Sequence, residues 1–106
     1  MLEIEYRPRA EADLDGILTY LVMAIKSPQA ARTVAAEIFS AIERAAELPE
    51  IGRLLQDDSL EHAAYRCTIA HNYRIYYRVR GETLTVWRIF HTSQDTDEYG
   101  FTLFDD

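Results

Sequence analysis

The chain has 106 residues, which is the length of a single domain. Its composition, 48% hydrophobic and 27% charged, is typical of a packed globular protein and excludes a disordered one. Eleven Lys and Arg against 18 Asp and Glu give a net charge of −7, which argues against a protein that holds nucleic acid by bulk charge.

No targeting or membrane signal stands out. The longest uncharged run, residues 16–25, is too short to span a bilayer, and the N-terminus has charges where a signal peptide has an apolar core. The single cysteine, Cys67, excludes an internal disulfide. We therefore expect a cytoplasmic domain that contacts no membrane.

The first half of the chain is predicted to form a strand and two helices. Residues 2–7 alternate apolar and charged side chains, which indicates a strand that Pro8 ends. From Ala10 the apolar residues follow the helical period, and a second helix is predicted from its N-cap, Ser27, to about Leu48. The alanine-rich stripe of this second helix allows close approach, so we expect an antiparallel helical hairpin.

The second half is predicted to be a loop followed by strands. Residues 53–61 have no clear period and indicate a loop. Three strands follow, over residues 64–69, 73–80 and 83–91. In the last strand Arg88 falls on the same side as Val86 and Phe90, so the alternation leaves open which of its faces is buried.

This order of elements, β-α-α-β-β-β, predicts an α+β fold. The helical hairpin should pack on one face of a mainly antiparallel four-stranded sheet and leave the other face open. We expect residues 1–95 to form one domain and residues 96–106 an acidic, aromatic tail. Residues 95–106 hold five acids and no base, and the tail aromatics Tyr99, Phe101 and Phe104 predict that the tail packs against another surface.

The open face of the central strands is expected to be rich in arginine. Alternation places Arg74, Tyr76 and Arg78 in one row, and Arg66 and Arg80 are assigned to the same face. Arginine and aromatic side chains hold phosphates and stack bases, and they are equally enriched at protein–protein hot spots. An ordinary solvated face, its arginines paired with nearby acids, is the simpler alternative.

Other chemistry has little support in the sequence. The three histidines lack the spacing of metal ligands and the four glycines are scattered, so no metal and no cofactor is expected. Cys67 is expected to be a small core residue and not a nucleophile. His91 is the one candidate general acid or base, because histidine titrates near neutrality, although a hydrogen-bonding role explains it more simply.

Five segments of the chain form an ordered set of motifs. They are Ala30-Ala31, Leu-Pro-Glu-Ile-Gly-Arg at 48–53, Tyr-Arg at 65–66, Tyr-Arg-Ile-Tyr-Tyr-Arg-Val at 73–79 and Val-Trp-Arg-Ile-Phe-His-Thr-Ser-Gln-Asp at 86–95. Taken together over residues 2–95, they resemble the RelE/ParE superfamily of bacterial type II toxins. The fold of that superfamily has the same order of elements as the one predicted above.

The two main branches of this superfamily differ in activity. RelE-like members are ribosome-dependent mRNA endonucleases, and that branch would give catalytic or phosphate-holding roles to Arg66, Arg74, His91 and Tyr99. Two further basic positions of the branch are Thr68 and Gln94 here, and the loss of two cations weakens the case for phosphodiester cleavage. The long hairpin and the His-x-x-x-Asp ending resemble the ParE-like branch, whose members inhibit DNA gyrase.

The resemblance therefore implies a ParE-like toxin that binds and inhibits DNA gyrase and is neutralised by a cognate ParD-like antitoxin. On this interpretation the chain is not itself an enzyme and reads no specific DNA sequence. The residues expected to bind partners are Arg66, Arg74, Tyr76, Arg78 and Trp87. Two alternatives stay open: a RelE-like endonuclease, and a toxin-like binding protein that has no activity.

Overall fold

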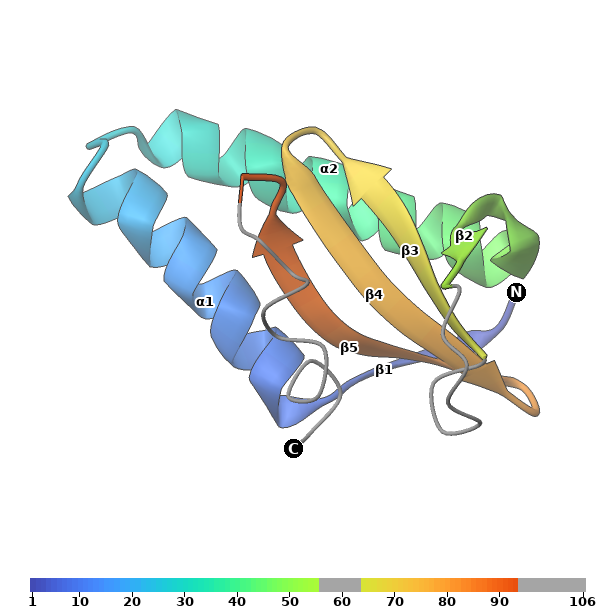
Figure 1. The fold of residues 1–106 in the computed structure, drawn as a ribbon. Coiled ribbons are helices and arrows are strands. Elements are labelled where there is room, and N and C mark those ends of the chain that lie inside the picture. The colour runs from blue at the N-terminus through green and yellow to red at the C-terminus, as the bar shows by residue number, and fades with distance from the viewer. Residues whose placement is uncertain (56–63, 94–106) are drawn as a thin grey trace.

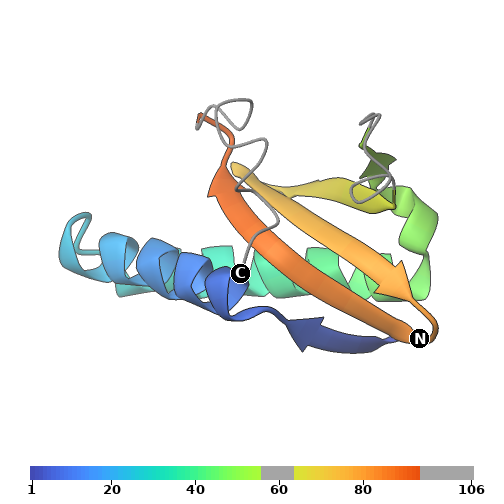
Figure 2. The same cartoon turned by 60° about the horizontal axis from the view of Figure 1, so that its bottom comes forward.

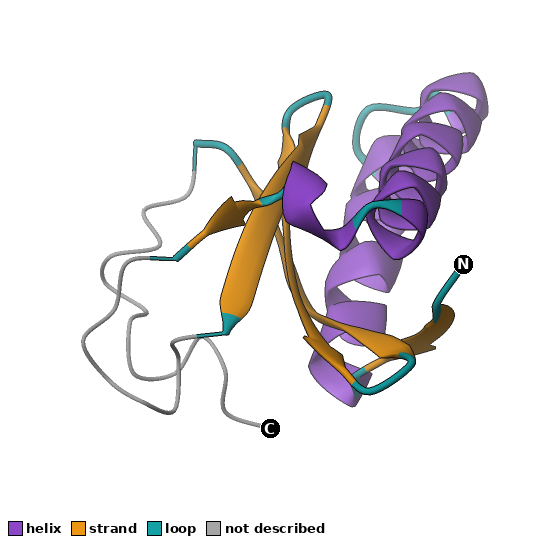
Figure 3. Cartoon of the chain, turned by 90° about the vertical axis from the view of Figure 1, so that its right-hand side faces the viewer, coloured by secondary structure: helices purple, strands orange, loops and turns teal. Residues whose placement is uncertain are grey.

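The computed structural model describes residues 1–55 and 64–93, which form a helical hairpin packed on one face of a twisted sheet (Figure 1). The elements in chain order are β1 (Glu3–Tyr6), α1 (Pro8–Met23), α2 (Pro28–Glu47), the 3-10 turn η1 (Pro49–Ile51), β2 (Arg53–Leu54), β3 (Tyr65–Ala70), β4 (Tyr73–Arg80) and β5 (Thr83–His91). Figure 3 shows both helices on the same side of the sheet. The expected α+β fold is confirmed.

The sheet has five strands in the order β1-β5-β4-β3-β2, so the predicted count of four is wrong. β1 runs parallel to β5, and the other neighbouring pairs are antiparallel. The additional strand is β2, whose Arg53 and Leu54 pair with Cys67 and Arg66 of β3. Two residues are too few to show an alternation, which is why this segment was predicted as part of a loop.

Each helix begins at a proline, and a short left-handed turn joins them. The Ser27 Oγ accepts a hydrogen bond from the Ala30 N–H at 3.1 Å, which confirms Ser27 as the N-cap of α2. Lys26 before it has a φ of 61°, and this positive angle reverses the chain direction. α1 starts two residues before the predicted Ala10, because Pro8 is well tolerated at the first helical position.

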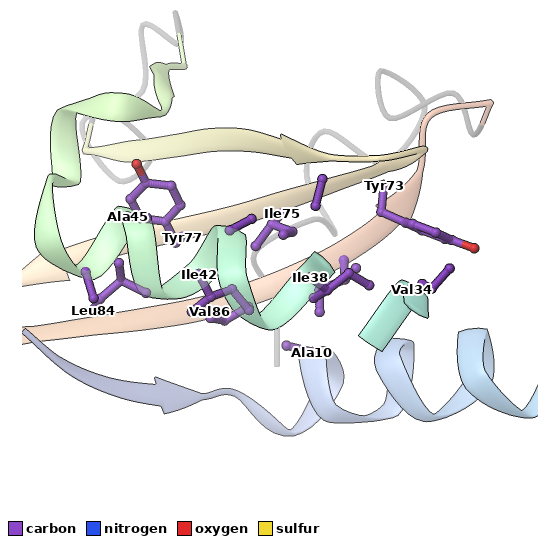
Figure 4. Packing of buried hydrophobic residues seen from close by; sticks show 14 residues of the cluster. Ala10, Val34, Ile38, Ile42, Ala45, Tyr73, Ile75, Tyr77, Leu84 and Val86 are labelled. Atoms are coloured by element: carbon purple, nitrogen blue, oxygen red, sulfur yellow. The ribbon is translucent and has the colours of Figure 1, made fainter. Parts of the chain in front are cut away.

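The main core lies between α2 and the central strands (Figure 4). Ile38 and Ile42 of α2 pack there with Ile75 of β4 and Leu84 of β5, and all four are at most 1% exposed. α1 is buried less completely, since Ala10 is its one buried residue. The closed end of the hairpin extends past the strands in two views (Figures 1 and 2).

A β-bulge resolves the ambiguity of the last strand. The register of β4 with β5 shifts between Tyr76, which pairs with Arg88, and Tyr77, which pairs with Val86. Trp87 is therefore an extra residue, and the alternation changes side after it. Val86 lies in the main core before the bulge and Ile89 after it, whereas Arg88 lies beside Tyr76.

The face of the sheet away from the helices was predicted to be open, and this prediction is wrong. Tyr65, Cys67, Tyr76 and Phe90 form a second buried cluster there, each 3–6% exposed. Tyr76 meets Phe90 edge to face with ring centroids 6.0 Å apart. Large rings on adjacent strands pack against one another in this way, which a strand-by-strand alternation does not anticipate.

Candidate functional site

Arginine and aromatic side chains alternate in a row across the far face of the sheet. The row begins at Arg7, just after β1, whose Cζ lies 4.8 Å from the centroid of the Trp87 ring of β5. The Cζ of Arg78, on β4, lies 5.2 Å from the Trp87 ring and 4.7 Å from the ring of Tyr65 on β3. These distances fall within the range of cation–π interactions. We call Arg7, Trp87, Arg78 and Tyr65 the arginine–aromatic row.

The other residues predicted for this face lie beside the row. Arg74 is half-buried and pairs in register with Ile69 and Phe90. Tyr76 is on the same face but only 4% exposed, so it lies beneath the surface. Arg80, at the end of β4, is exposed. The row and Arg74 thus present cationic groups over a buried aromatic layer.

Arg66 lies on the opposite face, so its assignment to the arginine-rich face is wrong. It pairs in register with Tyr77, which belongs to the main core under the helices. Its Nη1 donates a hydrogen bond to the carbonyl oxygen of Gly52 at 2.8 Å. The sequence placed Arg66 on the side opposite Tyr65 correctly, but only the β3–β4 register decides which side faces the helices.

Arg66 belongs to a structural junction that joins η1 and β2 to the sheet. The Tyr77 hydroxyl donates to the carbonyl oxygen of Pro49 at 2.5 Å and accepts from the Gly52 N–H at 3.0 Å. A Cβ at position 52 would lie 2.3 Å from that hydroxyl, so glycine is required for the close approach. Burial raises the pKa of Tyr77, against the lowering effect of the Gly52 N–H and the Arg66 charge.

An ion pair that sequence reasoning missed fixes α1 to the C-terminal half of β5. Both Asp13 carboxylate oxygens accept from Arg88, at 2.8 Å from Nε and 3.1 Å from Nη2. The same carboxylate accepts the backbone N–H of Ile89 at 2.9 Å. The two side chains are only 16% and 14% exposed. No local signal identifies this pair, because 75 residues separate its partners.

A groove of about 990 Å³ lies between the closed end of the hairpin and the end of β5. Its walls include Ile17 and Tyr20 of α1 and Val34 of α2, with Tyr73 and His91 on the sheet side. Large apolar side chains near this end of the hairpin are exposed: Tyr20, Val22, Met23 and Ile25. This groove is an apolar surface that the described residues leave available for a partner.

The four nuclease candidates do not gather in one place. Arg66 and Arg74 lie on opposite faces of the sheet. His91 packs edge to face against Tyr73 at 5.4 Å, and its Nδ1 lies 2.7 Å from the Ser93 Oγ. Tyr99 and the rest of the predicted tail, 96–106, lie outside the described residues. The described candidates therefore form no common cleavage site.

Cys67 is a buried residue of the second cluster, as expected for a small core side chain. Burial raises the pKa of its thiol, while the charges of Arg53 and Arg74 act in the opposite direction. In the part of the chain that the structure describes, no group of three His, Cys, Asp or Glu side chains is placed to hold a metal ion, and no helix is long and apolar enough to cross a membrane.

Comparisons with known proteins agree with this architecture. The chromosomal ParDE toxin–antitoxin system from P. aeruginosa superposes with a TM-score of 0.68 at 20% identity, covering 86% of this chain and 96% of that chain. The toxin–antitoxin complex RelBE2 from Mycobacterium tuberculosis superposes with a TM-score of 0.62 at 19% identity, covering 88% and 93%. These similarities show a shared fold. No curated protein sequence matches the chain significantly.

The sequence itself also matches a family model, that of the ParE toxin of the type II toxin–antitoxin system parDE, over residues 4–96. The match covers nearly the whole chain, from β1 to just past β5. The resemblance to the RelE/ParE superfamily is thereby confirmed. The chain belongs to the ParE toxin family of type II toxin–antitoxin systems.

Proposed function

We propose that this ParE-family toxin acts by binding and inhibiting DNA gyrase and that a cognate ParD-like antitoxin neutralises it. The observation that carries the choice of gyrase over the ribosome is the family match over residues 4–96. The dispersal of the nuclease candidates supports the same choice. Arg66 is held at the Gly52 carbonyl, on the face opposite Arg74, where the two cannot stabilise one phosphoryl transition state.

The surface proposed to contact gyrase is the far face of the sheet. Arg78 and Trp87 belong to the arginine–aromatic row, and Arg74 lies next to it. Tyr76 supports this surface from beneath, and Arg66 acts indirectly by holding the Gly52 segment. Arginine and tryptophan at the centre of an interface contribute most of its binding energy in many complexes.

The surface proposed to receive the antitoxin is the apolar groove at the closed end of the hairpin. Tyr20 is 58% exposed, Ile25 52% and Met23 70%, which is a large apolar area for a protein that has no partner bound. An amphipathic segment can lay its apolar face into such a groove. The two solved structures with this fold are toxin–antitoxin systems by their titles, which supports an antitoxin as the occupant.

The gyrase proposal is tested by DNA supercoiling. Micromolar wild-type protein should block supercoiling by purified gyrase or trap cleaved DNA. Arg78→Glu should weaken this inhibition about tenfold or more, since it reverses a charge at the centre of the surface. Arg32→Glu, an exposed position on α2, is the matched control and should inhibit like the wild type. Gyrase that is unaffected by the wild type would rule the proposal out.

The endonuclease alternative is tested with the same preparation on translating ribosomes. Intact messenger RNA is the expected result. Codon-positioned cuts that disappear in Arg74→Ala would replace gyrase with the ribosome as the target. Harmless overexpression in the absence of the antitoxin, with both assays negative, would instead indicate a binding protein that has no activity.

The antitoxin surface is tested by co-purification with the product of a neighbouring short gene. Ile25→Glu places a charge in the groove and should abolish the complex, because an unpaired carboxylate in an apolar interface is costly. Arg32→Glu serves again as a control and should keep the complex intact.

A further inference from the structure

The arginine–aromatic row contains a cation that the described part of the chain does not neutralise. Arg78 is half-buried between the rings of Tyr65 and Trp87, and among residues 1–55 and 64–93 no acid forms an ion pair with it. A partly desolvated guanidinium is stabilised when a carboxylate or phosphate accepts its hydrogen bonds. The row therefore has the chemistry of an anion-binding surface.

The way the row is stacked restricts the shape of its ligand. The guanidinium carbons of Arg7 and Arg78 lie over the faces of the rings, and the N–H donors of arginine lie in the guanidinium plane. A ligand that supplies carboxylates to these donors and rings to the neighbouring apolar surface would extend the alternation of the row.

The chain carries a segment with this composition after the end of β5 in the sequence. Residues 96–106 hold four acids, Asp97, Glu98, Asp105 and Asp106, with no base and with three aromatic side chains. β5 ends at His91, four residues beyond Trp87, which corresponds to about 13 Å of strand. Residues 94–106 can span roughly 40 Å when extended, so the acids can reach every member of the row.

We propose that the C-terminal segment 96–106 docks on the arginine–aromatic row of its own chain, with its carboxylates on the Arg78 guanidinium group. The docking itself does not depend on the identity of the target. Where the proposed function holds, gyrase has to displace this segment to bind the row. The segment is then an intrinsic competitor that sets how readily the toxin engages an external partner.

Trp87 is the only tryptophan in the chain, so its fluorescence reports directly on the row. The test compares quenching by acrylamide, a neutral molecule, in the full-length wild type and in a full-length variant with the four tail acids neutralised (Asp97→Asn, Glu98→Gln, Asp105→Asn, Asp106→Asn). The variant should be quenched about twofold more strongly, because loss of the charge-assisted contacts releases the segment from the row.

A second variant separates docking from a general effect of net charge. Neutralising Asp15, Glu43, Glu47 and Glu50, all exposed on the helical side, changes the net charge equally, from −7 to −3. This control should be quenched like the wild type. Equal quenching of all three proteins, or an equal increase in both variants, would overturn the proposal.

Salt gives a measurement on the unmodified chain. In 1 M sodium chloride the Debye length falls to about 3 Å, so exposure of Trp87 in the wild type should rise toward that of the tail-neutral variant. Quenching that does not respond to salt would contradict the proposal. A single-stranded DNA of about 12 nucleotides provides one more test. If it protected Trp87 to the same extent in the wild type and in the tail-neutral variant, the row would be open to an external polyanion and the proposal would be contradicted.

Discussion

The two faces of the sheet are buried by different kinds of side chain. Under the helices, aliphatic residues such as Ile75 and Leu84 are completely enclosed and have one way to pack. On the far face, rings are interleaved with the guanidinium groups of Arg7 and Arg78. The first face provides stability, and the second is the one proposed for recognition, so substitutions on the two faces should affect different measurements.

The largest effect is expected from Ile75→Ala, in the core under the helices. Ile75 is fully buried, and its truncation should lower the free energy of unfolding by about 2–5 kcal/mol through lost burial and a residual cavity. Urea denaturation measures this change. Arg80→Ala, exposed on the same strand, is the control and should stay within about 0.5 kcal/mol of the wild type.

Asp13→Asn, at the edge where the two faces meet, is expected to have the next largest effect on stability. The amide cannot accept both Arg88 hydrogen bonds and the Ile89 N–H as the carboxylate does, and it leaves a half-buried cation without its counter-charge. Loss of charged hydrogen bonds should reduce stability by about 1.5–3 kcal/mol. An additional Arg88→Gln should recover part of the loss, and strictly additive losses would show that the pair is not coupled.

Tyr77→Phe tests the polar junction that joins η1 and β2 to the sheet. The substitution keeps the ring but removes the partner of the Gly52 N–H and the Pro49 carbonyl, at a cost of about 1–3 kcal/mol. Amide hydrogen exchange of Gly52 should increase along with the loss of stability. Unchanged exchange at Gly52 would mean that this amide does not depend on the hydroxyl.

Arg78→Gln addresses the far face and should cost only about 1 kcal/mol, the typical value of a cation–π contact. Its effect on gyrase inhibition should be much larger than its effect on unfolding. A variant that loses stability as Ile75→Ala does, and inhibits like the wild type, would assign the row to the core instead of to recognition.

The smallest effect concerns alkaline pH. Burial raises the pKa of Cys67 on the far face and of Tyr77 on the helix side above their ordinary values of 9.0 and 10.0. The unfolded chain therefore loses these protons first, so their contribution to stability is complete below about pH 9 and declines as the pH rises through the raised pKa values. Urea denaturation of Cys67→Ala and Tyr77→Phe across this range should each show a shallower decline than the wild type.

The sequence was informative wherever a local pattern is long enough to have a period. The Ser27 cap, the α2 stripe and the ranges of β4 and β5 follow from capping chemistry and alternation. β2 escaped prediction because its pairing with β3 is decided by contact between distant segments. The bulge at Trp87 escaped for the same reason, and its visible trace was the conflict between Arg88 and the apolar side of its strand.

The candidate site was predicted less completely than the fold. Arg74 and Arg78 were placed on the correct face, but Arg66 was not, since period-2 alternation gives the two faces of a strand without naming which one meets the helices. Arg7 was missed because it follows the end of β1 and contacts Trp87 only through the β1–β5 pairing. The groove depends on how far the hairpin extends past the sheet, which no local pattern encodes.

The position of Asp13 has a consequence beyond holding α1. β1 pairs with β5 only as far as Val86, so the rest of that strand would otherwise present backbone amides to any extended chain that came alongside. The carboxylate occupies the Ile89 amide and makes this margin of the sheet unsuitable as a template for intermolecular strand addition. One backbone donor of the exposed margin is thereby withdrawn from edge-to-edge pairing between copies of the chain.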